Sequence, residues 1–410
     1  MNGEFLFLAH RLPFPPDRGD KIRSHHLLKA LAELAPVHVA CFAETAEDRA
    51  SERLLEQCAE SHCMPTRSKP VPFAGVEAFA RGLPVSLTAF YHPEIAAFVE
   101  RTLRERPIET IYVFSGQMGQ YIPADWDGRL VVDLVDVDSA KFEQYAGEGG
   151  LMAGVHAREG RMLREFEARL ARIADRTLLV SEAEGDLLKS RLPVTSSAHI
   201  EVLGNGIDSA AFDPCDWQPH EDLAARPGPH LVFTGQMDYA PNIAAVQRMA
   251  RHILPEIRKK HPGACFHVVG RAPAAEVKAL DGKGGAQVWS EVPSVQPFLA
   301  AADLVVAPLS LARGIQNKVL EAMAMARPVL LTPQAATGID AVDGEHFAIA
   351  ESDVKQAQRA LTLLADEDAR KTMGAAARRF VVDSMSWPAM LARLPELVGR
   401  PAGEARRDAA

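Results

Sequence analysis

The sequence predicts an α/β protein with two doubly wound parallel sheets, and two observations carry that prediction. Short runs of apolar and β-branched residues alternate with longer helical runs almost throughout, and the short runs lack a strict polar alternation. Continuous apolar runs are typical of parallel strands buried on both faces. Residues 205–229, rich in Pro, Asp and Gly and without any period, separate two such series. We therefore expect two domains joined by a linker, facing each other across a cleft suited to a small molecule.

The elements follow in order along the chain. In the first half, the apolar runs predict strands at 4–9, 36–42, 110–114, 129–133, 177–181 and 199–203. In the second half, they predict strands at 230–234, 264–269, 286–289, 303–307 and 328–332. Helical periodicity occurs between them, for example at 20–34, 93–105, 241–260 and 352–367. A further helix at 155–174 carries several arginines, but its glutamates dilute the basic face, which favours a solvated helix over one that contacts lipid.

Composition excludes several classes of protein. The 410 residues are 47% hydrophobic and 24% charged, which is typical of globular proteins and not of disordered ones. The formal net charge of −9 argues against a dedicated nucleic-acid binder. Five scattered cysteines without a C-x-x-C pair indicate neither a disulfide framework nor a zinc site. No apolar run approaches the roughly 18 residues of a spanning helix, so we expect a cytoplasmic protein and leave peripheral contact with the inner face of the membrane open.

The segment 312–328 (ARGIQNKVLEAMAMARP) is the most informative part of the sequence. It follows an expected strand, and Gly314 precedes its helical part. Lys318 and Glu321 share one helix face, where free N–H groups and a lysine attract phosphate and a carboxylate can accept hydrogen bonds from sugar hydroxyls. An ordinary Lys–Glu pair on a solvated helix explains the spacing about as well. The apolar residues around Glu321 slightly favour a buried, functional carboxylate.

The loop after the first strand, HRLPFPPDRGDKIR, is a second candidate site. Loops that leave the carboxyl end of a parallel strand point towards bound ligands. Gly19 would let a ligand approach the backbone, and basic side chains such as Arg18 suit an anionic acceptor. A solvated basic turn with Asp20 as the helix cap is an equally good interpretation.

Three carboxylates follow another expected strand in VVDLVDVDS: Asp133, Asp136 and Asp138. They suit acid–base chemistry or contacts to sugar hydroxyls. A calcium loop is not indicated, since its glycine and terminal glutamate are missing. For at least one of the three aspartates, we favour a structural role, in which the side chain caps a helix or ends a strand.

Two further candidate site residues follow strands that are expected in the second half of the chain. Gly235 (FTGQMDYAPN) and Arg271 (VVGRAP) should face the ligand cleft, although a structural turn explains the glycine equally well. No G-x-G-x-x-G follows a strand, which argues against a dehydrogenase.

These motifs resemble the group 1 (family 4) retaining glycosyltransferases, which have the GT-B fold of two Rossmann-like domains. The segment LVVAPLSLARGIQNKVLEAMAMARPVLLT is similar to their donor-binding strand–loop–helix. The resemblance extends over the chain through PPDRGD, ADRTLLVSEAE, VLGNGID, FTGQMDYAPNIAAV and SMSWPAMLARL. The combination of ARGIQNKVLEAMAM, DLVDVDS and MDYAPN most resembles sugar transferases of exosortase (PEP-CTERM) exopolysaccharide loci.

The resemblance implies a domain plan. It consists of an acceptor-side domain at 1–205, a nucleotide-sugar domain at 206–380, a helix at 381–400 that crosses back to the first domain, and a tail at 401–410. It also implies retaining hexosyl transfer from a nucleoside-diphosphate sugar to a hydroxyl of a lipid-linked or glycan acceptor, with no cofactor and no obligatory metal.

Site residues follow from the same resemblance. The implied catalytic residues are Lys318, Arg271 and Asp136. The implied donor-binding residues are Gly235, Arg313, Gly314, Asn317, Lys318 and Glu321. The implied acceptor-side residues are His10, Arg18, Gly19, Asp20 and Asp138.

Three positions depart from the family pattern. The family commonly has two glutamates eight residues apart, whereas Arg313 stands at the first position and Glu321 at the second. Gln236 and Pro241 replace the usual Arg and Lys of the phosphate loop. Two alternatives therefore stay open beside the transferase: a nucleotide-sugar 2-epimerase of the same fold and a non-catalytic protein that binds sugar nucleotides.

Overall fold

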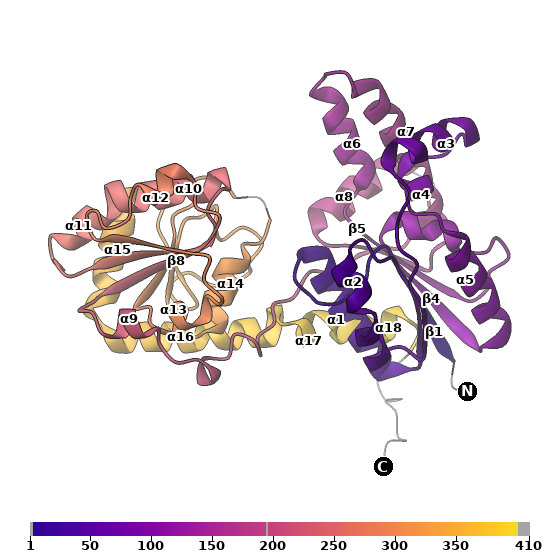
Figure 1. Ribbon diagram of the computed structural model, residues 1–410. Coiled ribbons are helices and arrows are strands. Elements are labelled where there is room, and N and C mark those ends of the chain that lie inside the picture. The colour runs from indigo at the N-terminus through magenta and orange to yellow at the C-terminus, as the bar shows by residue number, and fades with distance from the viewer. Residues whose placement is uncertain (1–2, 194–195, 313, 401–410) are drawn as a thin grey trace, which may run out of the picture. The chain divides into compact units, whose positions relative to one another are not determined.

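The computed structural model describes residues 3–193, 196–312 and 314–400, and the chain divides into two compact units (Figure 1). Unit 1 comprises the described residues up to Asn205 and those from Met390 onward, and unit 2 comprises Gly206–Ala389. Each unit holds one parallel sheet with helices on both faces. The predicted fold class is thus confirmed. Among the described residues, no helix combines the length and apolarity that crossing a bilayer requires.

Unit 1 contains a sheet of seven parallel strands in the order β3-β2-β1-β4-β5-β6-β7. The strands are β1 (Glu4–Ala9), β2 (Val37–Ala40), β3 (Ser61–Cys63), β4 (Ile108–Phe114), β5 (Arg129–Val135), β6 (Arg176–Leu179) and β7 (Ile200–Val202). All six residues of the central strand β1 are buried, as its uninterrupted apolar run predicts. The edge strand β3 escapes prediction because its sequence, Ser-His-Cys, is not an apolar run, and all three residues are only partly buried.

The helices of unit 1 connect these strands. They are α1 (Gly19–Leu34), α2 (Ala46–Ala50), α3 (Val71–Arg81), α4 (Val85–Ala89), α5 (Pro93–Glu105), α6 (Asp138–Gly147), α7 (Ala153–Ile173) and α8 (Glu182–Arg191). The chain returns to this unit through α17 (Trp387–Met390), and α18 (Leu394–Leu397) lies within it. Arg129 Nη1 donates to the Leu397 carbonyl at 3.1 Å, which ties this last helix to β5.

Helix α7 is less solvated than its sequence indicates. Glu159 accepts hydrogen bonds from the backbone N–H groups of Val85 and Ser86, and Glu167 accepts one from that of Ser139. The two carboxylates thereby satisfy donors in the first turns of α4 and α6. Both glutamates are buried, so the expectation of a solvated helix is wrong for this side of α7.

Unit 2 contains six parallel strands in the order β10-β9-β8-β11-β12-β13. The strands are β8 (His230–Gln236), β9 (Cys265–Arg271), β10 (Ala286–Ser290), β11 (Leu304–Ala307), β12 (Val329–Leu331) and β13 (Ala348–Ile349). The helices are α9 (Glu221–Ala224), α10 (Ala240–Arg248), α11 (Leu254–Arg258), α12 (Ala275–Lys278), α13 (Gln296–Ala300), α14 (Asn317–Ala324), α15 (Asp353–Ala365) and α16 (Glu367–Phe380). The order of connection reverses between β8 and β11, which is where open sheets of this type bind ligands.

The aperiodic stretch before β8 is not a free linker. Residues 206–229 belong to unit 2, and Leu223 of α9 is fully buried in its core. The Ile207 N–H donates to the Met385 carbonyl at 2.8 Å, which ties the start of this stretch to the end of the unit. Pro, Asp and Gly residues indicate an irregular backbone, but they do not show whether that backbone packs against the core of a domain.

A buried ion pair joins helix α1 to the sheet of unit 1. Arg23 Nη2 lies 2.8 Å from the Asp133 carboxylate, and Tyr112 donates to the same carboxylate at 3.1 Å. Arg23 Nη1 donates to the Asn205 side chain at 3.0 Å. Arg23 is 1% exposed and Asp133 0%, so each charge depends on the other for its stabilisation. Asp133 is therefore a structural carboxylate, as capping and strand termination had suggested for one of the three.

Arg23→Met should destabilise the protein by about 3–5 kcal/mol, because it leaves the Asp133 carboxylate buried without its partner. Equilibrium unfolding in urea measures this loss. Arg104→Met, which removes an exposed arginine of α5, should cost less than about 1 kcal/mol. Equal midpoints for the two variants would contradict this account of Arg23.

Candidate functional site

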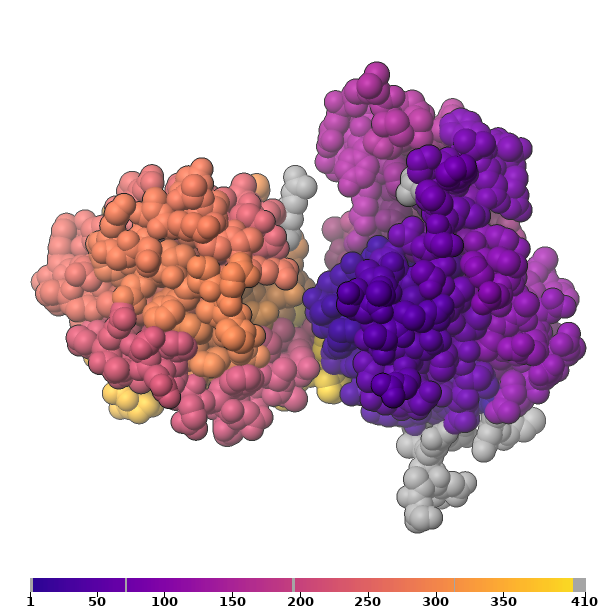
Figure 2. Space-filling model, viewed as in Figure 1, coloured from indigo at the N-terminus to yellow at the C-terminus, as the bar shows by residue number. Residues whose placement is uncertain are grey.

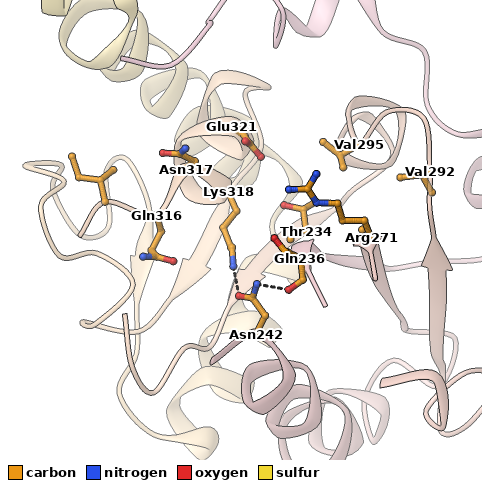
Figure 3. A pocket seen from close by; sticks show the side chains of 13 residues that line it. Thr234, Gln236, Asn242, Arg271, Val292, Val295, Gln316, Asn317, Lys318 and Glu321 are labelled. Atoms are coloured by element: carbon orange, nitrogen blue, oxygen red, sulfur yellow. Dashed lines mark hydrogen bonds between the residues drawn. The ribbon is translucent and has the colours of Figure 1, made fainter. Parts of the chain in front are cut away.

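A cavity of about 540 Å³ lies in unit 2 where β8 and β9 end and α14 begins (Figure 3). The cavity therefore lies beside the point between β8 and β11 where the order of connection reverses. Its walls carry few apolar side chains and many hydrogen-bonding groups. The lining residues are Thr234, Gly235, Gln236, Asn242, Gly270, Arg271, Val292, Val295, Ile315, Gln316, Asn317, Lys318 and Glu321.

Two glycines form the floor of this cavity. Gly235 and Gly270 are paired neighbours at the ends of β8 and β9, with φ of 154° and 157°. A Cβ atom on Gly270 would lie 1.8 Å from the Gly235 carbonyl oxygen, and one on Gly235 would lie 2.9 Å from Asn242 Nδ2. Only residues without a side chain fit here, so the cavity floor is bare backbone.

Lys318 projects from the first turn of α14 into the cavity, where Asn242 holds it (Figure 3). Its Nζ donates to Asn242 Oδ1 at 2.5 Å, and Asn242 Nδ2 donates to the Gln236 carbonyl at 2.8 Å. The ammonium also lies 4.6 Å from the centre of the Phe233 ring, a cation–π distance. Lys318 is thus fixed by contacts on β8 and α10.

Burial shifts the ionisation of both charged residues on this face of α14. It lowers the pKa of Lys318 to about 8, although the Glu321 carboxylate acts to raise it. It raises the pKa of Glu321 to about 7, against the opposing effect of Lys318. The two groups are therefore not the solvated pair of the simpler interpretation, because each is substantially removed from water. Perturbed groups that face a cavity are typical of functional sites.

The remaining donor-side predictions fall around the same cavity. Arg271 at the end of β9 and Asn317 at the start of α14 line it and are exposed. Gly314 is exposed in the loop before α14, with φ of 63°. It is not among the lining residues, but the next residue, Ile315, is. Arg313 lies outside the described residues.

The sequence did not single out two lining residues that the structure makes prominent. Asn242 is buried in the first turn of α10, directly after Pro241, and its role appears only when the carbonyl and the ammonium that it bridges are seen together. Thr234 is 3% exposed, and within the described part of the chain its hydroxyl has no hydrogen-bond partner. Because Thr234 lines the cavity, its hydroxyl is placed to form a hydrogen bond with a molecule bound there.

Four of the five acceptor-side predictions lie together in unit 1 after β1, whereas Asp138 begins α6. The Asp20 carboxylate lies 3.3 Å from both His10 Nε2 and Arg18 Nε. Burial acts to raise the pKa of Asp20, but the hydrogen bonds from His10 and Arg11 outweigh it and hold this pKa below its usual range. Gly19 is exposed at the start of α1, with open space where a side chain would lie.

The other two predicted carboxylates of unit 1 share one lysine. Lys141 of α6 lies 3.0 Å from Asp136 and 3.1 Å from Asp138. All three side chains are partly exposed, so they remain accessible to a ligand. Across the described residues, no group of three or more His, Cys, Asp or Glu side chains is arranged to hold a metal ion.

Glu321→Gln should lower the pKa of Lys318 below about 8, because it removes the carboxylate that helps keep the ammonium charged. A nitrogen or carbon NMR titration of the labelled lysine measures this value. Glu345→Gln, at an exposed position of the same unit, is the matched control and should leave it unchanged. A Lys318 pKa near that of free lysine in the unmodified protein would contradict the described burial.

Comparison with known proteins agrees with this architecture. Residues 228–367 match the family model for glycosyl transferases group 1. Alpha-maltose-1-phosphate synthase of Mycolicibacterium smegmatis is 24% identical over 234 residues, or 52% of this chain. The match spans 60% of the length of that curated relative.

Solved structures extend the likeness to nearly the full chain. HepE of Anabaena, in complex with UDP and glucose, superposes with a TM-score of 0.59 at 16% identity, covering 96% of this chain and 99% of that one. Sucrose-phosphate synthase from Thermosynechococcus elongatus gives 0.57 at 15% identity, covering 96% and 98%. WaaG, a glycosyltransferase involved in lipopolysaccharide biosynthesis, gives 0.56 at 16% identity, covering 97% and 100%.

At these identities the solved structures establish the fold: the two-unit chain has the GT-B fold. The match to glycosyl transferases group 1 lies within unit 2, the unit that holds the cavity.

Proposed function

We propose that this protein is a glycosyltransferase that moves a sugar from a nucleoside-diphosphate sugar to a hydroxyl of a lipid-linked or glycan acceptor. In this proposal it serves the assembly of an exopolysaccharide or another cell-surface glycan. The observation that carries the proposal is the cavity of unit 2, where a partly desolvated lysine, an arginine and a carboxylate surround a floor of bare backbone. HepE, which has been solved in complex with UDP and glucose and in complex with UDP-glucose, supports the choice of donor class.

The chemistry of the lining residues fits the parts of such a donor. Lys318 and Arg271 are suited to the diphosphate, since hydrogen bonds from ionised donors to phosphate oxygens are stronger than those between neutral groups. The glycine floor allows phosphate oxygens to approach the backbone, as it does in other phosphate sites. Glu321 is suited to the ribose hydroxyls, and the buried hydroxyl of Thr234, which lines the cavity, adds one further donor.

Catalysis by these groups rests on neutralising the departing diphosphate. As the bond between the anomeric carbon and the phosphate oxygen breaks, negative charge grows on the leaving group, and Lys318 and Arg271 offset it. Asn242 keeps the lysine in place before the reaction, so little reorganisation is needed. We further propose retention of configuration and an acceptor-side role in unit 1 for Asp136, Asp138, His10, Arg18, Gly19 and Asp20.

A non-catalytic sugar-nucleotide binder is the alternative that a specific observation favours. Gln236 and Pro241 stand where the family has its phosphate-loop Arg and Lys, which leaves fewer cations at the cavity. Consumption of the donor excludes this alternative. An epimerase is separated from a transferase by product analysis without acceptor, because an epimerase needs none.

One nucleoside diphosphate among UDP, GDP and ADP should stabilise the protein against thermal unfolding, with or without magnesium. A ligand at about 100 times its dissociation constant stabilises a protein by about 2.7 kcal/mol, which gives a measurable shift of the melting temperature. The effective nucleotide also names the base of the donor. No shift with any of the three at millimolar concentration would contradict the assignment of this cavity.

Lys318→Ala should weaken binding of that nucleotide by about 10- to 100-fold, since a hydrogen bond to a charged group contributes about 1.5–3 kcal/mol. Calorimetric titration measures the change. Lys355→Ala, an exposed lysine of α15, is the matched control and should bind normally. Equal affinity in both variants would remove Lys318 from the site.

A further inference from the structure

Three polar side chains form a hydrogen-bonded chain at the amino ends of the first three strands of unit 1. His38 Nε2 lies 2.7 Å from Glu4 Oε2, and His38 Nδ1 lies 2.7 Å from the Ser61 hydroxyl oxygen. The register of the sheet produces this arrangement, because Ser61 of β3 is the partner of His38 on β2. On its other side His38 pairs with Leu6 of β1, and Glu4 lies two residues before Leu6. Side chains two residues apart on a strand share one face, so the three groups lie on the same face of the sheet.

The charge of Glu4 determines which nitrogen of His38 carries a proton. Arg106 donates to both carboxylate oxygens of Glu4, from Nε at 2.8 Å and from Nη2 at 2.7 Å. Burial acts to raise the pKa of Glu4, but the hydrogen bonds from Arg106 and His38 outweigh it and hold this pKa below its usual value. An ionised carboxylate only accepts hydrogen bonds, so Nε2 of His38 is the donor. In the neutral imidazole, Nδ1 then has a lone pair and accepts the hydrogen bond from the Ser61 hydroxyl.

A serine hydroxyl that donates to an oriented imidazole is the arrangement that activates a nucleophile. His38 is placed to take the Ser61 proton, and Glu4 holds the imidazole in the required tautomer and stabilises the imidazolium that forms. The side chains of Glu4 and His38 are 9% and 3% exposed, whereas Ser61 is only partly buried. The nucleophile is therefore the member of the three that a substrate can reach.

A cavity of about 250 Å³ is lined by both Ser61 and His38, so the nucleophile and the base face the same space. Arg101 of α5 also lines it and is exposed, with its guanidinium 5.7 Å from the centre of the Phe98 ring. A guanidinium is suited to the negative charge that develops on a carbonyl oxygen under attack. The lining residues are His38, Glu60, Ser61, Phe98, Arg101, Thr102, Glu105 and Arg106.

The cavity can be entered from solvent. Glu60 and Glu105, which line it, are exposed. All of the lining residues belong to the indigo and purple part of the chain, and Figure 2 shows that this part forms much of the visible surface of unit 1. The acceptor-side residues follow the carboxyl end of β1, whereas this cavity lies at the amino ends of β1, β2 and β3. The two sites therefore lie at opposite ends of the strands.

We infer that Ser61 is the nucleophile of a second active site, which hydrolyses small carboxylic esters. Ser61 Oγ bonds to the ester carbonyl carbon as its proton passes to His38 Nδ1. The proton then moves to the alcohol oxygen as the bond from that oxygen to the carbonyl carbon breaks, which leaves the acyl group on Ser61. Water gives a proton to His38, attacks the acyl carbon and releases the carboxylic acid, and His38 returns the proton to Ser61 Oγ. This activity goes beyond the proposed sugar transfer and does not depend on it.

The test uses the full chain and a biotin-tagged fluorophosphonate, which bonds to an activated serine oxygen as fluoride leaves. Peptide mass spectrometry should locate the adduct on Ser61, and Ser61→Ala should remove it. The same variant should lower the hydrolysis of p-nitrophenyl acetate, above the protein-free background, by at least about 100-fold. Ser190→Ala, at an exposed serine of α8 in the same unit, is the matched control and should react like the unmodified protein.

Glu4→Gln tests the positioning role of the carboxylate. Its amide oxygen can still accept from Arg106, but its amide nitrogen would donate to His38 Nε2 and leave the proton on Nδ1, where it blocks transfer from Ser61. Labelling should slow by at least about 100-fold. Nitrogen NMR of the labelled imidazole should show the proton on Nε2 in the unmodified protein and on Nδ1 in the variant, a change that a merely structural carboxylate would not predict.

Three outcomes would overturn the inference: no adduct on the unmodified protein, an adduct on another residue with Ser61 unlabelled, or equal labelling rates for Glu4→Gln and the unmodified protein. The first two outcomes come from the unmodified protein and do not depend on the folding of any variant. Far-ultraviolet circular dichroism and the nucleotide-induced thermal shift should be the same in all variants. A protein that keeps this shift and forms no adduct contradicts the esterase site alone, which separates its failure from failure of the proposed function.

Discussion

The close approach of Gly235 and Gly270 is the constraint on which the rest of the site depends. Because no side chain fits between the ends of β8 and β9, the two strands end together and leave their last peptide groups open to the cavity. The Gln236 carbonyl then lies where Asn242 can donate to it, and Asn242 in turn receives the ammonium of Lys318. A backbone contact between two strands thus fixes a charged side chain on a helix more than eighty residues away in the sequence.

Burial of Lys318 and Glu321 disfavours the charged forms of both side chains. Lys318 and Glu321 are each shifted towards their neutral forms, which is the opposite of what two solvated neighbours would show. Within the described part of the chain, the ammonium of Lys318 contacts one amide oxygen and one aromatic ring, and an ammonium group has three protons to donate. An anion that entered the cavity would supply the missing acceptors. The lining of the cavity and the setting of Lys318 support a binding role for it.

Sequence patterns predicted the long strands, the two-sheet class and the grouping of Gly235, Arg271 and Lys318, because carboxyl ends of parallel strands necessarily share one edge. They could not identify Asn242, since an amide is recognised as a bridge only when both of its partners are known. They also misjudged residues 206–229 and the inner side of α7, where polar residues pack because backbone donors need them. The composition of a segment shows how polar the segment is. Whether the segment packs depends on the other elements that it contacts.

The most direct test of the central claim is a crystal structure of the protein with the nucleoside diphosphate that stabilises it. The account predicts a diphosphate within hydrogen-bond distance of Lys318 Nζ and the Arg271 guanidinium, above the glycine floor, with the ribose beside Glu321. A nucleotide bound in the opposite sense, with its base against Glu321, would contradict the assigned roles. A nucleotide bound away from this cavity would contradict the site itself.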